Sequence, residues 1–239
     1  MGGLLYKNFY YLKIEVIVLA VLQMICSISV FFVSSAARGG DEAALQDSMM
    51  IIMIVYFCAF YLATLFDMGL FAADEKRIST CFIISTPKGA KSHIQSKYYT
   101  LIILNLAVLF CCIITDTISC VLADSTLLSC SAFLVLFFSG NLILTAFGVP
   151  FTIRFGSANG GNIKIATAGV IILILAVYFL FGDVSIFMVE DPVAEIMKWL
   201  ESGDVLLILS LIPYIAVVLY YISYKISLAL YLKGAENYD

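Results

Sequence analysis

A glycine-rich segment at residues 156–161 is the first place in this 239-residue sequence where a phosphate group could bind. In a P-loop, two glycines are separated by four residues and followed by Lys and then Ser or Thr, so that backbone amides and the lysine ammonium meet the phosphates. Gly156 and Gly161 have this separation, but Asn-Ile-Lys follows Gly161. The segment therefore predicts no site for ATP hydrolysis in this chain.

Acidic and amide side chains inside apolar runs are a second kind of candidate functional residue. Asp67 lies seven residues before Asp74, which is about 10 Å along a helix. A carboxylate at that depth is costly unless it is hydrated, paired or neutral, and such residues often mark a transport pathway. Asp67 and Asn141 are therefore candidate pathway residues, with hydration near the headgroups as the alternative for Asp67. Asp116 lies near the end of its apolar run, where hydration is easier.

Metal and haem sites are not predicted. His93 is the only histidine, so paired axial ligands are not available, and its place among basic residues is typical of a solvated side chain. The seven cysteines lie mostly in apolar runs without metal-ligand spacing. Such residues commonly act as small hydrophobic side chains in helices, so we expect neither a metal ligand set nor a disulfide framework.

The elements that must position these residues are membrane helices. The sequence is 63% hydrophobic and 13% charged, with a mean hydropathy of +1.06. Each crossing of a bilayer needs about 20 apolar residues. We predict an all-α integral membrane protein with one transmembrane domain over residues 1–239. Its six spans are expected at about 14–35, 48–72, 98–122, 127–151, 165–181 and 205–224.

The distribution of charge orients these spans. The stretch from Phe71 to Tyr99 holds five of the thirteen Lys and Arg residues, and basic residues collect in cytoplasmic loops. With both termini cytoplasmic, only Arg38 and Lys198 of these thirteen lie outside, whereas ten of the seventeen acidic residues fall in outer loops. We therefore predict cytoplasmic N- and C-termini, because the opposite orientation would reverse this distribution.

Three further helices are expected at the membrane surfaces. Residues 1–13 combine aromatic side chains with two lysines, which suits an interfacial helix. Residues 192–202 follow a cap-like Asp-Pro and place apolar side chains at helical spacing, which predicts an outer amphipathic helix. In the loop 73–97, Ile78 and Phe82 would form an apolar stripe on a short helix, which would be a docking surface. Thr86-Pro87 then has the pattern of an N-cap and a first helical residue.

Short motifs in order along the chain resemble small bacterial ABC-2-type transporter permeases. The opening Gly3-Leu4-Leu5-Tyr6-Lys7-Asn8-Phe9 is similar to that family's amphipathic start, where an acid usually stands in place of Asn8. Asp74-Glu75, Thr86-Pro87 and Ser96-Lys97-Tyr98 resemble its first cytoplasmic loop, although residues 78–81 lack the aromatic often seen there. Pro150-Phe151 and Arg154-Phe155-Gly156 resemble its second cytoplasmic loop.

The resemblance implies a permease subunit of an ATP-driven exporter in the bacterial plasma membrane, without an ATPase site of its own. Two such subunits, identical or not, would pair among membrane lipids and move an amphipathic or hydrophobic peptide, lipid or drug outward. Each would dock a separate ABC-type subunit that binds ATP and Mg, and this chain would bind no cofactor and no nucleic acid. The implied coupling residues are Asp74, Glu75, Lys76, Arg77, Ile78, Phe82, Thr86 and Pro87, with Arg154 and Gly156 in the second loop.

Two other classes of membrane protein stay open at this point. An ion- or proton-coupled secondary transporter usually shows internal repeats and helices broken at the midplane, and only Pro213 could break a span here. An intramembrane enzyme needs clustered Glu, His or Asp near the membrane surface, and the single histidine argues against it. Dependence on a proton gradient would favour the first class, and dependence on ATP favours the permease.

The topology gives a direct test. In a variant without native cysteines, Ser92→Cys and Ser202→Cys should react with membrane-impermeant thiol reagents from opposite sides of the membrane, because the two positions lie in an inner and an outer segment. Labelling of both from the same side would contradict the six-span arrangement.

Overall fold

The computed structural model describes residues 2–40, 42–72, 89–124, 129–156 and 203–236, together with residues 162, 166, 169 and 173. Within these residues all regular secondary structure is helical, as the fold class predicts. The coupling segment 73–88 and the predicted outer helix at 192–202 lie outside the described residues, as does most of the predicted fifth span at 165–181.

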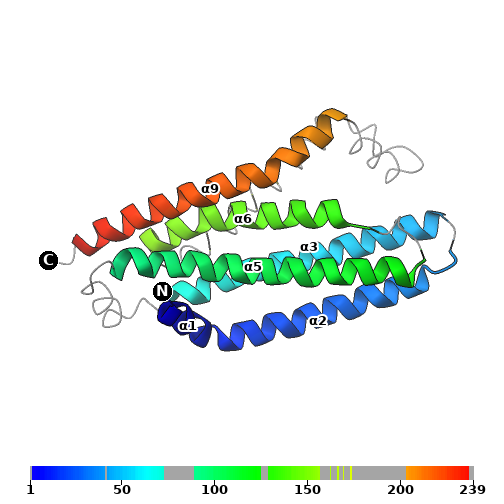
Figure 1. The fold of residues 1–239 in the computed structure, drawn as a ribbon, viewed down its shortest axis with the longest axis horizontal. Coiled ribbons are helices and arrows are strands. Elements are labelled where there is room, and N and C mark those ends of the chain that lie inside the picture. Colours follow the sequence, from blue (N-terminus) through cyan, green and yellow to red (C-terminus); the bar gives the residue numbers. More distant parts are fainter. Residues whose placement is uncertain are drawn as a thin grey trace.

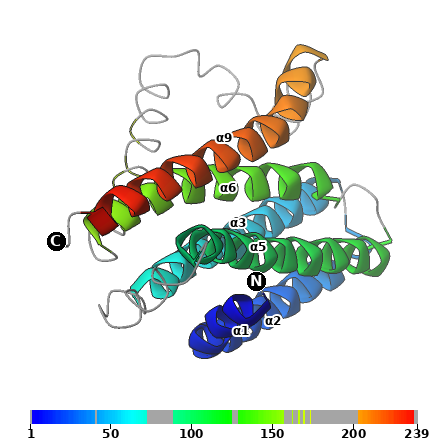
Figure 2. The ribbon, with the colours of Figure 1, turned by 60° about the vertical axis from the view of Figure 1, so that its left-hand side comes forward.

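The described residues form six helices, which make an elongated bundle (Figure 1). The five long helices lie roughly along one axis. The short α1 lies at one end together with the start of α5 and the end of α9, and we call this the α1 end (Figures 1 and 2). α5 packs against each of the other five. The helices are α1 (Gly2–Tyr11), α2 (Lys13–Ala36), α3 (Glu42–Ala72), α5 (Gly89–Leu122), α6 (Ser131–Phe155) and α9 (Gly203–Glu236).

Four of these helices are long and apolar enough to cross a membrane. They are α2, α5, α6 and the part of α9 from Ser210 to Lys233. α3 has 31 residues, of which Asp47–Tyr61 form a shorter described apolar stretch. The helices fall on five of the six predicted spans, whereas the number six and the side of each terminus stay predictions.

The boundaries of α5, α6 and α9 differ clearly from the predicted spans. The sequence places residues 89–97 in the cytoplasmic segment 73–97, with a short helix after Thr86-Pro87. α5 begins at Gly89, so these residues are helical but form one helix with the third span. These residues are polar in sequence but bury one face against neighbouring helices, which hydropathy does not reveal. α6 begins at Ser131 and ends at Phe155, four residues later than predicted at each end, and α9 continues well beyond residue 224.

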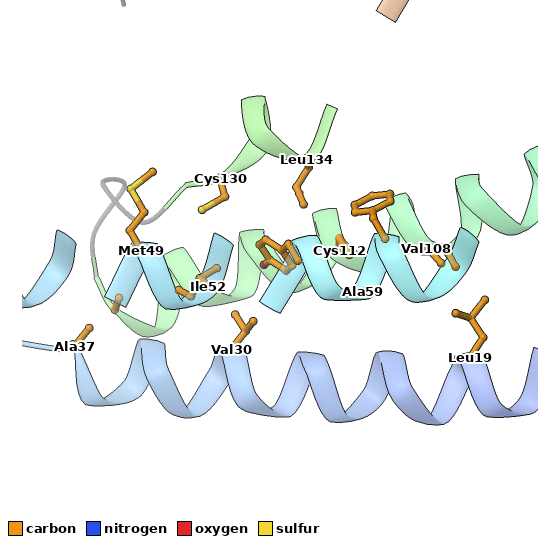
Figure 3. Close-up of a cluster of buried hydrophobic side chains, with 14 residues drawn as sticks. Leu19, Val30, Ala37, Met49, Ile52, Ala59, Val108, Cys112, Cys130 and Leu134 are labelled. Carbon is orange, nitrogen blue, oxygen red and sulfur yellow. The ribbon is translucent and has the colours of Figure 1, made fainter. Parts of the chain in front are cut away.

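An apolar core joins α2, α3, α5 and the start of α6. Leu19 and Val30 of α2 point toward the other helices, where Ile52 of α3 and Cys112 of α5 meet them (Figure 3). All four side chains are buried, and Val30, Ile52 and Cys112 are fully so. Four of the seven cysteines predicted to be small hydrophobic side chains contribute to this cluster, fully buried or partly buried at its edge (Cys26, Cys112, Cys120 and Cys130).

α2 and α3 approach each other closely at Gly69 near the α1 end. A Cβ atom on Gly69 would lie 3.2 Å from Oε1 of Glu15 and 3.6 Å from a methyl carbon of Leu12. Small residues allow this kind of approach between membrane helices. The position therefore brings the first turn of α2 against the last turn of α3.

The far end of the bundle is organised by Asp116. This carboxylate is only 3% exposed, and its Oδ1 accepts the backbone N–H of Cys130 at 3.0 Å. Its Oδ2 accepts a longer hydrogen bond from Ser129 Oγ at 3.4 Å. Asp116 thus fixes the residues that lead into α6, and it is buried, contrary to the hydration expected from its place in the sequence.

Replacing this carboxylate should destabilise the fold far more than replacing an exposed one nearby. Asp116→Ala leaves the buried Cys130 N–H without its acceptor, which should lower the free energy of unfolding by about 1–3 kcal/mol. Asp124→Ala removes an exposed ion pair with Arg38, in which both side chains are about two-thirds exposed, and should cost about 0–1 kcal/mol. Thermal unfolding in detergent measures both changes, and equal losses would contradict the assignment.

Candidate functional site

The start of α5 carries a group of buried polar side chains, which we call the α5 polar cluster. It consists of His93, Ser96, Lys97, Tyr98 and Thr100, none of which is more than 3% exposed. Burying such groups costs free energy unless each finds a partner within the protein. Their partners come from α1, α3 and α9.

Lys97 joins α5 to the C-terminal end of α3. Its Nζ donates to the carbonyl oxygen of Leu70 at 3.1 Å and lies 4.0 Å from the centroid of the Phe71 ring. Leu70 is among the last four residues of α3, whose carbonyls lack partners within the helix and carry partial negative charge. The helix end and the aromatic face therefore both favour the buried ammonium.

Asn8 joins α1 to the same turns of α5. Its Nδ2 donates to Ser96 Oγ at 3.3 Å and to Thr100 Oγ1 at 3.2 Å. Both hydroxyls donate their own hydrogens to backbone carbonyls of α5, so each is left as an acceptor. An amide satisfies this arrangement, whereas a carboxylate at this position would need these hydrogens to be redirected. The departure at position 8 therefore has a local physical reason.

Tyr98 joins α5 to α9 and α6 through a chain of hydroxyl groups. Its Oη lies 2.7 Å from Ser223 Oγ and 2.8 Å from Ser227 Oγ. Ser223 Oγ donates its one hydrogen to the Ala146 carbonyl of α6 at 2.6 Å, so Tyr98 donates to Ser223 and accepts from Ser227. The Tyr98 carbonyl accepts a further hydrogen bond from Tyr220 Oη at 2.8 Å.

His93 lies between the start of α5 and the C-terminal part of α9. It is 1% exposed, and its ring centroid lies 5.8 Å from that of Tyr231. The expectation of a solvated histidine is therefore wrong. The neighbouring basic residues suggested a loop, whereas the helix turns this side chain toward α9.

Asn141 pairs with Asn105 at the meeting of α3, α5 and α6. Asn141 Nδ2 donates to Asn105 Oδ1 at 2.6 Å and to the Phe60 carbonyl at 3.1 Å, and Asn105 Nδ2 donates to the Leu101 carbonyl at 3.0 Å. Because carbonyl groups only accept, these contacts fix the orientation of both amides. Asn141 is thus an interhelical contact in this arrangement, and a role in a pathway stays a prediction.

The family can be assigned from a match over nearly the whole sequence. It matches the profile described as ABC-2 family transporter protein over residues 3–232. The chain belongs to the ABC-2 transporter family. No curated protein and no solved structure matches it.

The family confirms the resemblance seen in the short motifs and makes this chain a multi-pass membrane protein that serves as a transporter permease. Permeases of the ABC-2 family are in general non-enzymatic membrane subunits that work with an ABC-type ATP-binding partner. Among the described residues of this permease, no group of three or more His, Cys, Asp or Glu side chains could hold a metal ion.

The predicted site residues of this permease lie in different parts of the structure. The first-loop positions from Asp74 to Pro87 are outside the described residues, as is the side chain of Asp67, whose backbone belongs to α3. Arg154 is exposed in the last turn of α6, with its guanidinium 5.5 Å from the Phe155 ring. Gly156 ends α6 at a φ of 86°, which favours glycine, and its N–H donates to the Thr152 carbonyl. Figure 1 places this end of α6 at the α1 end.

The α5 polar cluster was not predicted as a site, although the sequence contains a signal for it. His93, Ser96, Lys97 and Thr100 recur three or four residues apart, which is the spacing of one face of a helix. A polar stripe of this kind can face either water or other helices. Here the stripe is buried because it finds polar partners on other helices. One of these partners, Asn8, lies more than 80 residues away and cannot be recognised from local spacing.

The amide pair of this permease predicts a specific pattern of stability. Asn141→Leu removes the donor to Asn105 and should lower the free energy of unfolding by about 1 kcal/mol, the usual range for such contacts in membranes. The double variant Asn105→Leu with Asn141→Leu removes both partners and should cost less than the two single changes added together. Strict additivity in thermal unfolding would show that the pair is not coupled.

Proposed function

We propose that this chain is the membrane subunit of an ATP-driven exporter in the bacterial plasma membrane, with six spans and both termini in the cytoplasm. The observation that carries the proposal is the Lys97 contact, which joins α3 to α5, the two helices that flank the segment 73–88, in a chain of the ABC-2 family. A segment between two helices joined in this way is suited to receive force from a partner and to pass it to the bundle. The second loop, at Arg154 and Gly156, lies at the same end.

The energy must come from another chain, because this one has no phosphate-binding sequence. A separate ABC-type subunit with bound ATP and Mg would dock on the first loop. Ile78 and Phe82 would fill an apolar cleft in that subunit, where a buried aromatic anchor commonly dominates binding. The charged residues Asp74 to Arg77 would set its orientation with smaller individual energies. Thr86-Pro87 would fix the angle at which the segment enters α5.

The substrate class follows from the family resemblance. Amphipathic or hydrophobic peptides, lipids or drugs would move outward along a pathway formed with a second permease subunit. Asp67 is the position we assign to that pathway. Asn141 is less suited to it, because both of its amide hydrogens are used within one subunit.

Phe82→Ala tests the docking surface. The change should remove an anchor worth about 2 kcal/mol or more. The tagged permease should then lose its co-purifying ATP-binding subunit, while its insertion into the membrane is unaffected. Lys88→Gln in the same segment is the control and should change little. Retention of the ATP-binding subunit at wild-type stoichiometry by Phe82→Ala would show that this loop is not the coupling surface.

A further inference from the structure

Lys97 differs from most of the α5 polar cluster because it brings a full charge into the bundle. Hydrogen bonds between neutral side chains of membrane helices are individually weak. A buried ammonium that loses its partners is more costly, since its desolvation is no longer offset. Of the contacts described for the cluster, the one from Lys97 to Leu70 and Phe71 should therefore resist separation most strongly.

This contact bridges the two helices that flank the coupling segment. α3 ends at Ala72 and α5 begins at Gly89. Lys97 lies eight residues after Gly89, about 12 Å into α5 at 1.5 Å per residue. Leu70 lies two residues before the end of α3. A displacement of the segment 73–88 that pulls on α3 therefore pulls directly on α5.

The neighbours of Lys97 extend the connection to two more helices. Ser96 accepts a hydrogen bond from Asn8 of α1, and Tyr98 is bound to Ser223 and Ser227 of α9. The end of α3 therefore contacts α5 directly, and it is connected to α1 and α9 through the residues of α5 on either side of Lys97.

We propose that Lys97 is a positioning residue that transmits displacement of the coupling segment from α3 to α5, and through α5 to α1 and α9. The proposal rests on the proposed function, in which the segment 73–88 docks the ATP-binding subunit. Lys97 itself is 2% exposed, so it acts behind the docking surface and not within it.

A purely structural role for Lys97 has different consequences. If Lys97 only holds the bundle together, its replacement lowers the stability of the bundle, but the molecules that remain folded respond normally to ATP. A transmitting residue leaves docking intact and removes the response at the far end of the bundle. Ser131 at the start of α6 is exposed at that end and can report the response.

The experiment uses the complete permease with its ATP-binding subunit in proteoliposomes. The permease carries Ser131→Cys in a background without native cysteines, and the labelling rate by an impermeant maleimide is measured with and without ATP and orthovanadate. Lys97→Met keeps the length of the apolar stem but removes the ammonium. We expect normal co-purification of the ATP-binding subunit and an ATP-vanadate effect on labelling that is about tenfold smaller. Lys91→Met, an exposed lysine on the same helix, should behave as wild type.

Phe71→Leu provides a second variant if Lys97→Met does not insert. It keeps an apolar side chain beside the ammonium but removes the aromatic face, so it should reduce the ATP-vanadate effect in the same direction. A full effect in either variant would overturn the proposal, and so would loss of the ATP-binding subunit from Lys97→Met, which would place the residue in docking. If no ATP-binding subunit co-purifies with the wild-type permease, the proposed function itself fails.

Discussion

A polar side chain buried between membrane helices must find its partner inside the protein, because lipid tails offer none. α5 meets this constraint at three depths. Lys97 binds the C-terminal end of α3, Asn105 pairs with Asn141 of α6, and Asp116 accepts the N–H of Cys130 before α6 begins. Each contact joins α5 to a different part of the bundle. The arrangement of the other helices therefore depends on α5, which also packs against every one of them.

α2 differs from α5 in the kind of polar contact that it makes. Its described polar contacts to α5 are neutral, from Gln23 to Cys112 and from Ser27 to Thr115. Most of its large apolar side chains are exposed, as expected for a surface that faces lipid or another membrane subunit. The exposed members are Ile14, Ile17, Val18, Val21, Met24, Ile25, Ile28 and Phe32. α2 is thus held mainly by packing, which the close approach at Gly69 permits.

The sequence is a reliable guide where the physical signal is local. The apolar run at 14–35 predicts α2 almost to the residue, because a run of apolar side chains long enough to cross a bilayer is most stable as a membrane helix. At residues 89–97 the sequence predicts a short helix at the membrane surface and not the start of a buried helix, because hydropathy treats Lys97 and His93 as solvated and cannot register burial by distant helices. For the same reason Asp116 is expected to be hydrated. Asn141 stands out in the sequence as a polar residue within an apolar run, but its partner Asn105 can be identified only from the packing of α5 against α6.

The short motif Ser96-Lys97-Tyr98 acquires a physical meaning from the geometry of the helix. Consecutive residues of an α-helix point about 100° apart, so three of them in a row cover three different directions. Here Ser96 meets Asn8 of α1, Lys97 meets Leu70 of α3, and Tyr98 meets Ser223 of α9. Moving any one of these side chains along the sequence would turn it toward a different neighbour. A helix can therefore contact three others at one level through three residues adjacent in sequence, and Ser96-Lys97-Tyr98 joins α5 to α1, α3 and α9 in this way.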